Sequence, residues 1–294
     1  MNILIVNHEM RNFYGGTQTW TITMVKALRK LGHTTHFIGS DGTFNPLFKD
    51  DFQPILKTGY DLVIVNGNTG RAWKNSAPVS MLISHGVLPQ AEQPVAGFDI
   101  YLGVSEEVCE NIERKGFKCA GVLRNPIDLG KFTSSFKTRD TIKTIGFLDR
   151  RRKFPFINDI PSQYKVKLIG HPPTPNVKDE LDACDLVVAR GRGIYEAMAL
   201  GKNVIISGNN SGRSGQQELA DGFVTRENFN ELRKNNCSGR RMGIVVENVQ
   251  FLLDEIAKAT PEKALDNRKL MEENNDSINI ANEVVGYYES FRSK

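Results

Sequence analysis

Three segments of the chain contain glycines, charged side chains or both in patterns that suit an anionic ligand. The longest pattern spans residues 185–206, where an apolar stretch leads into a glycine-rich turn and then an acidic residue. Its chemically informative members are Arg190, Gly191, Arg192, Gly193 and Glu196. Main-chain N–H groups of such a turn can hold a phosphate at the start of a helix. The Glu196 carboxylate can accept hydrogen bonds from ribose hydroxyls, or it can complement the helix dipole from the first helical turn.

A second segment places four consecutive cations directly after an apolar stretch at residues 143–148. These cations are Arg150, Arg151, Arg152 and Lys153. Open α/β sheets bind ligands beyond the carboxyl ends of their strands, so guanidinium groups at this place suit a pyrophosphate. Consecutive charges also form solvated surfaces, and the sequence leaves both interpretations open.

The third segment contains Gly15, Gly16 and Thr17, a few residues after an apolar stretch that ends at Asn7. Paired glycines let a backbone approach a ligand closely, but a tight turn between a strand and a helix explains them equally well. The spacing matches neither the dinucleotide-binding fingerprint nor the nucleoside-triphosphate loop, which disfavours both classes. A single histidine, His85, follows another apolar stretch, where histidines are more often structural than functional.

Short apolar stretches alternate with helical patterns along the whole chain, which predicts an α/β fold with parallel sheets. Six stretches in the first half have the continuous Val/Ile/Leu character of strands that are covered on both faces. They are residues 2–7, 34–39, 61–66, 79–84, 98–104 and 118–123. We expect the first helix over residues 17–31, with an apolar stripe that includes Trp20, Met24 and Leu28.

A polar stretch at residues 130–140 interrupts this alternation, so we place a domain boundary there. The strands expected beyond it are residues 143–148, 164–169, 185–189, 203–207 and 242–246. The expected helices are residues 193–200, 226–234, 246–259 and 261–291, the last with a break near Asn274 and Asn275. The predicted organisation is two Rossmann-like domains, residues 1–138 and 139–275, facing across a cleft. A C-terminal helix of residues 276–294 is expected to pack back on the first domain.

The composition is that of a globular protein, with 39% hydrophobic and 24% charged residues among 294, which excludes disordered and collagen-like chains. No apolar run reaches the ~18 residues of a membrane span, and the N-terminus lacks a signal-peptide pattern, so we expect a soluble, cytoplasmic protein. The four cysteines have no zinc-ligand spacing and are expected to be reduced thiols, mostly buried. A net charge of +4 suits an anionic ligand but is small for a dedicated DNA-binding domain.

Longer stretches around the candidate residues match the motifs of one enzyme family. Residues 196–205 are E-A-M-A-L-G-K-N-V-I, close to a signature E-A-M-A-x-G-x-P-V-I with Asn203 in place of proline. Residues 125–132 are similar to an N-G-V-D-x-x-x-F segment at an interdomain crossing, and residues 104–108 to a V-S-x-x-x helix start. With the N-terminal glycine loop, the chain resembles GT-B glycosyltransferases of the retaining, family-4-like group. The resemblance covers nearly the whole chain and implies a GT-B fold.

The resemblance also implies where a nucleotide-sugar donor would bind. Glu196 would contact the ribose, and residues 191–193 would lie near the diphosphate and the sugar. Arg152 or Lys153 would occupy the family's diphosphate-binding lysine position, and His85 would be the active-site histidine near the donor sugar. The other implied donor contacts are Gly15, Gly16, Thr17, Arg150, Arg151, Arg190 and Arg192. No cofactor and no metal are implied, because the nucleotide-sugar is a co-substrate and the paired aspartates form no convincing metal-binding motif.

The implied activity is transfer of a hexosyl or pentosyl group from a nucleotide-linked donor, UDP above all, to an acceptor hydroxyl, with retention. The acceptor would be a glycan or lipid precursor, or a hydroxymethylated base in DNA, for which scattered arginines such as Arg226 and Arg241 offer contacts. Phe147 and Val188 replace an arginine and a glutamate of the family pattern. A catalytically inactive nucleotide-binding module of the same fold is therefore the alternative. A nucleotide-sugar epimerase is disfavoured by the few acid–base residues.

Overall fold

The computed structural model describes residues 1–8, 10, 15–43, 51, 58–133, 141–148, 154, 156–170, 177–208 and 218–294. Contacts divide the chain into two compact units, Met1–Asp128 with Asp276–Lys294, and Leu129–Asn275. We call them unit 1 and unit 2. The boundary expected at residue 138 lies outside the described residues. Phe132 belongs to unit 2, where its carbonyl accepts a hydrogen bond from Arg268 at 2.8 Å.

Unit 1 contains one six-stranded sheet in which every pairing is parallel. Its strands are β1 (Asn2–Asn7), β2 (Thr34–Gly39), β3 (Leu62–Asn66), β4 (Val79–Ser84), β5 (Ile100–Gly103) and β6 (Cys119–Val122). Residues of β3 and β4 are buried along their whole length, as expected where helices cover both faces of a sheet. All six strands expected in this half are confirmed.

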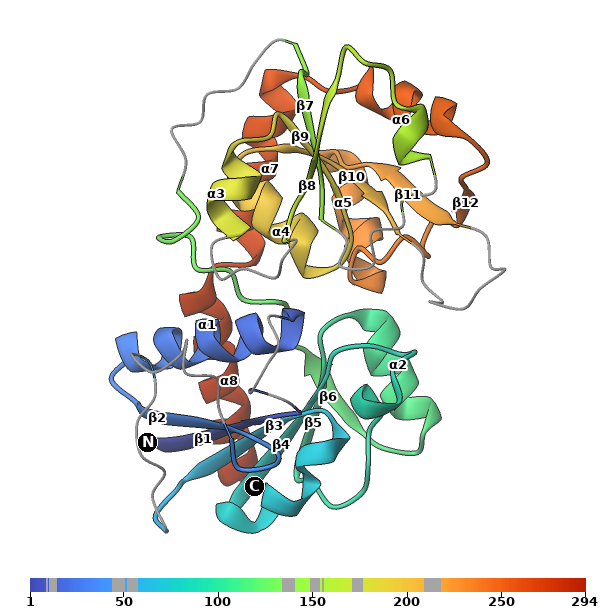
Figure 1. Cartoon of the computed structure of the whole chain (residues 1–294). Coiled ribbons are helices and arrows are strands. Elements are labelled where there is room, and N and C mark those ends of the chain that lie inside the picture. Colours follow the sequence, from blue (N-terminus) through green and yellow to red (C-terminus); the bar gives the residue numbers. More distant parts are fainter. Residues whose placement is uncertain are drawn as a thin grey trace. The chain divides into compact units, whose positions relative to one another are not determined.

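The helices of unit 1 are α1 (Gly16–Lys30), α2 (Glu106–Arg114) and α8 (Ser277–Arg292), with 3₁₀ turns η2 (Asn68–Ser76) and η3 (Gln90–Glu92). The apolar stripe of α1 is confirmed, since Trp20, Met24 and Leu28 are fully buried. Figure 1 shows α1 and α8 beside one another, and these two helices are in direct contact. Helix α8 adds Ile280 and Val284 to the hydrophobic core of unit 1.

Unit 2 contains a second six-stranded sheet with the order β12-β11-β10-β9-β7-β8. Its strands are β7 (Thr144–Phe147), β8 (Lys165–Leu168), β9 (Leu186–Ala189), β10 (Asn203–Ser207), β11 (Leu219–Phe223) and β12 (Ile244–Val245). Its helices are α3 (Val177–Asp182), α4 (Arg192–Ala199), α5 (Arg226–Leu232), α6 (Val249–Ile256) and α7 (Pro261–Asn274), and its 3₁₀ turns are η4 (Ile157–Asp159) and η5 (Arg233–Asn235). Strands β7 to β10 pair in parallel, whereas β11 and β12 are antiparallel.

Strand β11 was not expected from the sequence, because it carries a buried carboxylate and a glycine with positive φ. Gly222 has φ +82°, and Asp221 is 4% exposed. The main-chain N–H groups of Gly239 and Met242 donate to the Asp221 carboxylate at 2.9 and 2.7 Å. These bonds compensate the burial of a charge and anchor the loop that leads to β12.

The C-terminal segment breaks between two helices, as expected, and the two helices belong to different units. Helix α7 ends at Asn274 and packs on α4 and β10 of unit 2. Asp276 caps α8 by accepting the N–H of Ile278 at 2.8 Å, and the N–H of Ser277 donates to the carbonyl of Ile127 at 3.0 Å. In the described part of the chain, no helix is both long and apolar enough to cross a membrane.

Candidate functional site

The strand order of each unit defines one place where open α/β sheets bind ligands, the topological switch point. In unit 1 the chain runs from β1 to β2 on one side and then to β3 on the other, so the switch point lies at the carboxyl ends of β1 and β3. In unit 2 the corresponding place lies at the carboxyl ends of β7 and β9. The residues singled out from the sequence are found at these two places where the structure describes them.

Gly15, Gly16 and Thr17 lie at the switch point of unit 1, where they begin α1. Gly15 has an extended backbone, and its N–H donates to Oε1 of Gln18 at 2.8 Å. The hydroxyl of Thr17 lies 3.2 Å from the same oxygen. The Gly15 N–H is therefore used within the protein, and an anion would meet the N–H groups of the first helical turn, which lack intrahelical partners.

His85 follows β4 and belongs to a chain of buried amides at this switch point. Its Nε2 lies 3.0 Å from Oδ1 of Asn66, and Nδ2 of Asn66 donates to Oγ1 of Thr21 at 3.0 Å. Nδ2 of Asn7 donates to the same hydroxyl at 3.0 Å. Asn7, Asn66 and Thr21 are at most 1% exposed, so these bonds are shielded from water.

The Thr21 hydroxyl fixes the proton positions of this network. It has one proton, which it donates to the carbonyl of Thr17 at 3.0 Å, so it can only accept from the two asparagines. Asn66 consequently presents its oxygen to His85, and the neutral imidazole carries its proton on Nε2 and its lone pair on Nδ1. Trp20 packs edge-on against the ring, with centroids 5.4 Å apart, and fixes its plane.

A carboxyl group that the sequence analysis did not single out lies in the loop after His85. The Glu92 side chain packs against Gly86, and the hydroxyl of Ser84 donates to the Glu92 carbonyl. Burial raises the pKa of Glu92 to about 7. The residue type alone does not separate it from a solvated acid, and its position a few residues after a buried strand was the only available signal. Glu92 can hold or release a proton near neutral pH.

In unit 2 the glycine-rich turn joins β9 to α4 at the switch point. Gly191 has φ +55°, which disfavours other residues, and its N–H donates to the carbonyl of Cys237 at 2.8 Å. Gly193 lies close to Leu148, whose side chain would have to shift for a Cβ because that atom would lie 2.5 Å from its Cδ2. The expectation that Gly191 offers its N–H to a phosphate is therefore wrong, since that group already has a protein partner.

Glu196 and Arg192 form a buried ion pair. Helix α4 begins at Arg192, so the expectation that Glu196 stands in the first helical turn is wrong. Nε of Arg192 lies 2.8 Å from Oε1 of Glu196, with side chains 7% and 8% exposed. Burial lowers the pKa of Arg192, and the carboxylate opposes that shift. A ribose hydroxyl would share the Glu196 carboxylate with this guanidinium.

The remaining predicted residues divide into one described cation and four that lie outside the described residues. The Arg190 side chain extends from the end of β9 over Gly208, where a Cβ would lie 2.6 Å from its Cδ. The four outside the described residues are Arg150, Arg151, Arg152 and Lys153. Phe147 and Val188, the two departures from the family pattern, are each 3% exposed within the unit 2 core and thus unavailable to a ligand.

The aspartates considered for a metal have structural partners. Asp182 pairs with Lys202 at 3.1 Å, and Asp185 accepts the N–H groups of Lys143 and Thr144 at 2.9 and 2.8 Å. Asp51 pairs with Lys26 at 3.1 Å, and Asp50 lies outside the described residues. Among the described residues, no three His, Cys, Asp or Glu side chains form a group that could hold a metal ion.

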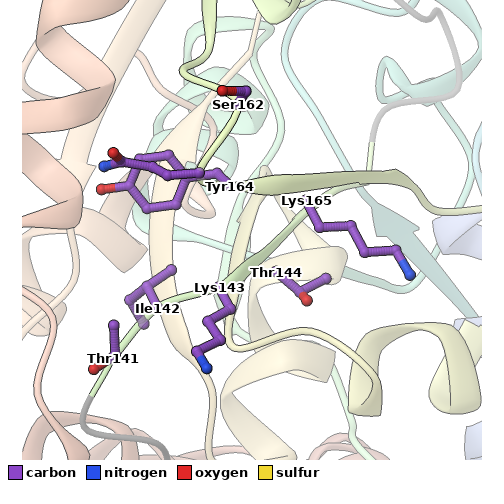
Figure 2. Close-up of a pocket in the computed structure, with 8 residues that line it drawn as sticks. Thr141, Ile142, Lys143, Thr144, Ser162, Tyr164 and Lys165 are labelled. Atoms are coloured by element: carbon purple, nitrogen blue, oxygen red, sulfur yellow. The ribbon is translucent and has the colours of Figure 1, made fainter.

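An open cavity of about 540 Å³ lies at the amino ends of β7 and β8, at the edge of the unit 2 sheet opposite the switch point. Figure 2 shows residues that line it, among them Lys143 and Thr144 at the start of β7, Lys165 at the start of β8, and Ser162 and Tyr164 from the segment before β8. It contains none of the predicted site residues. Because ligands of open α/β sheets bind at the carboxyl edge, this cavity is separate from the candidate site.

Comparison with known proteins identifies the fold. No protein-family description and no curated protein sequence matches the chain. One similar solved structure is the S. aureus MnaA–UDP co-structure, with 12% identity, a TM-score of 0.54, and 100% and 98% of the two chains covered. Another is an alpha-glucosyltransferase in complex with UDP and a 13-mer DNA containing a central A:G mismatch, with 13% identity, a TM-score of 0.53, and 98% and 100% covered. Together with the two sheets, these similarities show that the chain has a GT-B fold with C-terminal helices.

Proposed function

We propose that this protein is a glycosyltransferase that moves a sugar from a nucleotide-sugar, UDP-linked, to an acceptor hydroxyl. The observation that carries the proposal is the placement of the sequence motifs. Gly15–Thr17 and His85 lie at the switch point of unit 1, and Arg190–Glu196 lies at the switch point of unit 2. Both structural relatives with the same fold are described with UDP, which supports this class of donor.

In this proposal Glu196 binds the ribose, with Arg192 holding its carboxylate in place. The diphosphate leaves with negative charge, which the first turn of α4 and the cations Arg150–Lys153 would stabilise. His85, oriented by Asn66 and Trp20, would contact the donor sugar. In a retaining reaction the departing phosphate oxygen accepts the proton of the acceptor hydroxyl, so no protein nucleophile is required.

A ligand panel tests the donor. Thermal unfolding would be measured with UDP, GDP, ADP and CMP, and then with the matching sugar donors. A ligand at 100 times its Kd stabilises a protein by about 2.7 kcal/mol, so UDP should raise the Tm where the other nucleotides do not. Transfer would then be followed by mass spectrometry on a glycan, a lipid-linked sugar and hydroxymethylated DNA. No stabilisation by any nucleotide or nucleotide-sugar would contradict the proposal.

Single-residue variants test the roles proposed for the two switch points. Glu196→Gln keeps the shape of the side chain and should weaken UDP binding about tenfold, which corresponds to one lost charge-assisted hydrogen bond. His85→Ala should lower transfer and leave UDP affinity nearly unchanged, because its interaction belongs to the reacting sugar. His33→Ala is the matched control, since His33 precedes β2 at the amino edge of the same sheet. Equal transfer by the His85 and His33 variants would remove His85 from the site.

The second candidate is a nucleotide-binding module without activity. It is favoured by the burial of Phe147 and Val188 and by the engagement of Glu196 with Arg192. Tight UDP binding without hydrolysis or transfer of any UDP-sugar would support it.

Arg226 and Arg241 offer few contacts to a DNA acceptor, because their side chains pair with Glu273 and Glu231.

A further inference from the structure

Two cysteines of unit 1 converge on one main-chain oxygen. Cys109 lies on α2 and Cys119 on the edge strand β6. Their sulfurs lie 3.2 and 3.5 Å from the carbonyl oxygen of Gly121. In the sequence the four cysteines are scattered and form no CxxC pair. The fold places them together.

The surroundings hold this pair in place without sealing it from solvent. Gly103 of β5 allows α2 to approach the sheet, since a Cβ there would lie 2.9 Å from Sγ of Cys109. Tyr287 of α8 packs on Gly121 beside the two sulfurs. Cys109 and Cys119 are nevertheless only half-buried, so a small molecule in solution can reach them.

The other two cysteines provide an internal contrast. Cys184 and Cys237 are 2% and 0% exposed in unit 2. Burial raises the pKa of Cys184 to about 11, which keeps it a thiol and unreactive. In unit 1 the neighbouring Cys109 thiol lowers the pKa of Cys119, and burial and the carboxylate of Glu113 oppose that shift. Cys119 is thus the thiol that more readily becomes the attacking thiolate.

We propose that Cys109 and Cys119 form a reversible dithiol–disulfide couple that takes a small-molecule disulfide, such as oxidised glutathione, as its oxidant. The Cys119 thiolate attacks one sulfur of the oxidant, the S–S bond of the oxidant breaks, and one thiolate leaves. Cys109 then loses its proton to solvent and attacks Sγ of Cys119, which releases the second thiol. The protein pair loses two electrons, and one disulfide molecule is reduced to two thiols.

Helix α2, which carries Cys109, is hydrogen-bonded to the loop after His85. Asn111, on the same helix as Cys109, donates from Nδ2 to Oε1 of Gln93 at 3.0 Å. Gln93 in turn donates to the carbonyl of Val87 at 2.9 Å, in the loop after His85. A disulfide would cross-link α2 to β6 and so act on the helix that supports this loop. This site is independent of the proposed transferase activity.

The test uses the full chain in buffers with varied ratios of reduced to oxidised glutathione, followed by acid quenching, alkylation and peptide mass spectrometry. We expect a peptide pair linked through Cys109 and Cys119 that has lost two hydrogen atoms and that returns to the dithiol in reduced glutathione. Cys184 and Cys237 should react at least roughly tenfold more slowly, until the protein is unfolded. In Cys109→Ser, Cys119 should instead stop at the mixed disulfide with glutathione.

Two results would overturn the proposal. One is a wild-type protein in which Cys109 and Cys119 carry only separate glutathione adducts. The other is a wild-type protein in which both remain fully alkylatable in oxidised glutathione alone. Circular dichroism of each sample verifies that the fold is retained, and the wild-type measurement decides the question even if the serine variant does not fold.

Discussion

The two switch points of this molecule are built from opposite kinds of polar contact. In unit 1, neutral groups of Asn7, Asn66 and Thr21 form a buried network that ends on His85. In unit 2, a buried charge pair of Arg192 and Glu196 occupies the corresponding place. A neutral network orients a proton and costs little to bury, whereas an ion pair costs desolvation energy and depends on both partners. Unit 2 should therefore respond more strongly to the loss of a single side chain.

The largest effect is expected for Glu196→Ala, which leaves the Arg192 guanidinium buried without its carboxylate. Removing one partner of a buried ion pair costs about 3–5 kcal/mol. Urea unfolding of the variant measures this loss, and replacing both residues by Met and Leu should restore much of it. A loss below about 1 kcal/mol would show that the pair is solvated rather than buried.

The next largest effect concerns Glu92 in unit 1. Because its folded pKa is raised to about 7 from 4.5, the folded state holds a proton that the unfolded state releases, so stability falls as the pH rises between these values. The loss reaches up to about 3 kcal/mol at 1.36 kcal/mol per pKa unit. Thermal unfolding from pH 4 to pH 8 should show this fall, and Glu92→Gln should flatten it. The same variant should retain transfer if the reaction is retaining, because that route needs no protein base.

A smaller effect is expected for Thr21→Val, which removes the shared hydroxyl of the neutral network at nearly constant volume. Two buried amides lose an acceptor, and part of the loss is recovered as they reorient, so we expect about 2 kcal/mol. Long-range nitrogen NMR of His85 should show that the neutral ring no longer holds its proton on Nε2 alone. Thr23→Val is the control: the Thr23 hydroxyl donates to the carbonyl of Thr19 on the same helix at 2.7 Å. An unchanged His85 tautomer in Thr21→Val would contradict the network.

The smallest effect is expected for Glu273→Gln at the exposed pair with Arg226. These side chains are 40% and 51% exposed, and their N–O distance of 3.0 Å resembles that of the buried pair. Water screens such a pair, so unfolding of this variant should be indistinguishable from that of the parent. A loss as large as that of Glu196→Ala would mean that distance, and not burial, decides the contribution.

Most strands could be predicted because their apolar runs are continuous and bounded by polar residues, as for residues 2–7 and 79–84. Strand β11 could not, because Asp221 and Gly222 are stabilised by a loop some twenty positions later in the chain. The predicted start of α4, at Gly193, is one residue late for a similar reason. Gly191 takes its conformation from a hydrogen bond to Cys237, and the sequence contains no local sign of that contact.

The types of residue at the candidate site could be predicted from the sequence, but the residues that they contact could not. Glycines and His85 next to strand ends are local patterns that motifs capture. The asparagines that orient His85 have no distinctive type, and they meet at Thr21 only because β1, β3 and α1 are neighbours in the fold. The same holds for Arg192: the sequence suggests a donor contact, and the fold pairs its side chain with Glu196.

The discontinuous unit 1 has a consequence for synthesis on the ribosome. Its core includes Ile280, Ala281 and Val284 of α8, and these residues are translated after all of unit 2. The nascent chain therefore presents the first sheet before the part of its core that α8 supplies, while unit 2 can fold from its own contiguous residues. Unit 1 is thus begun first and completed only after unit 2 has been synthesised.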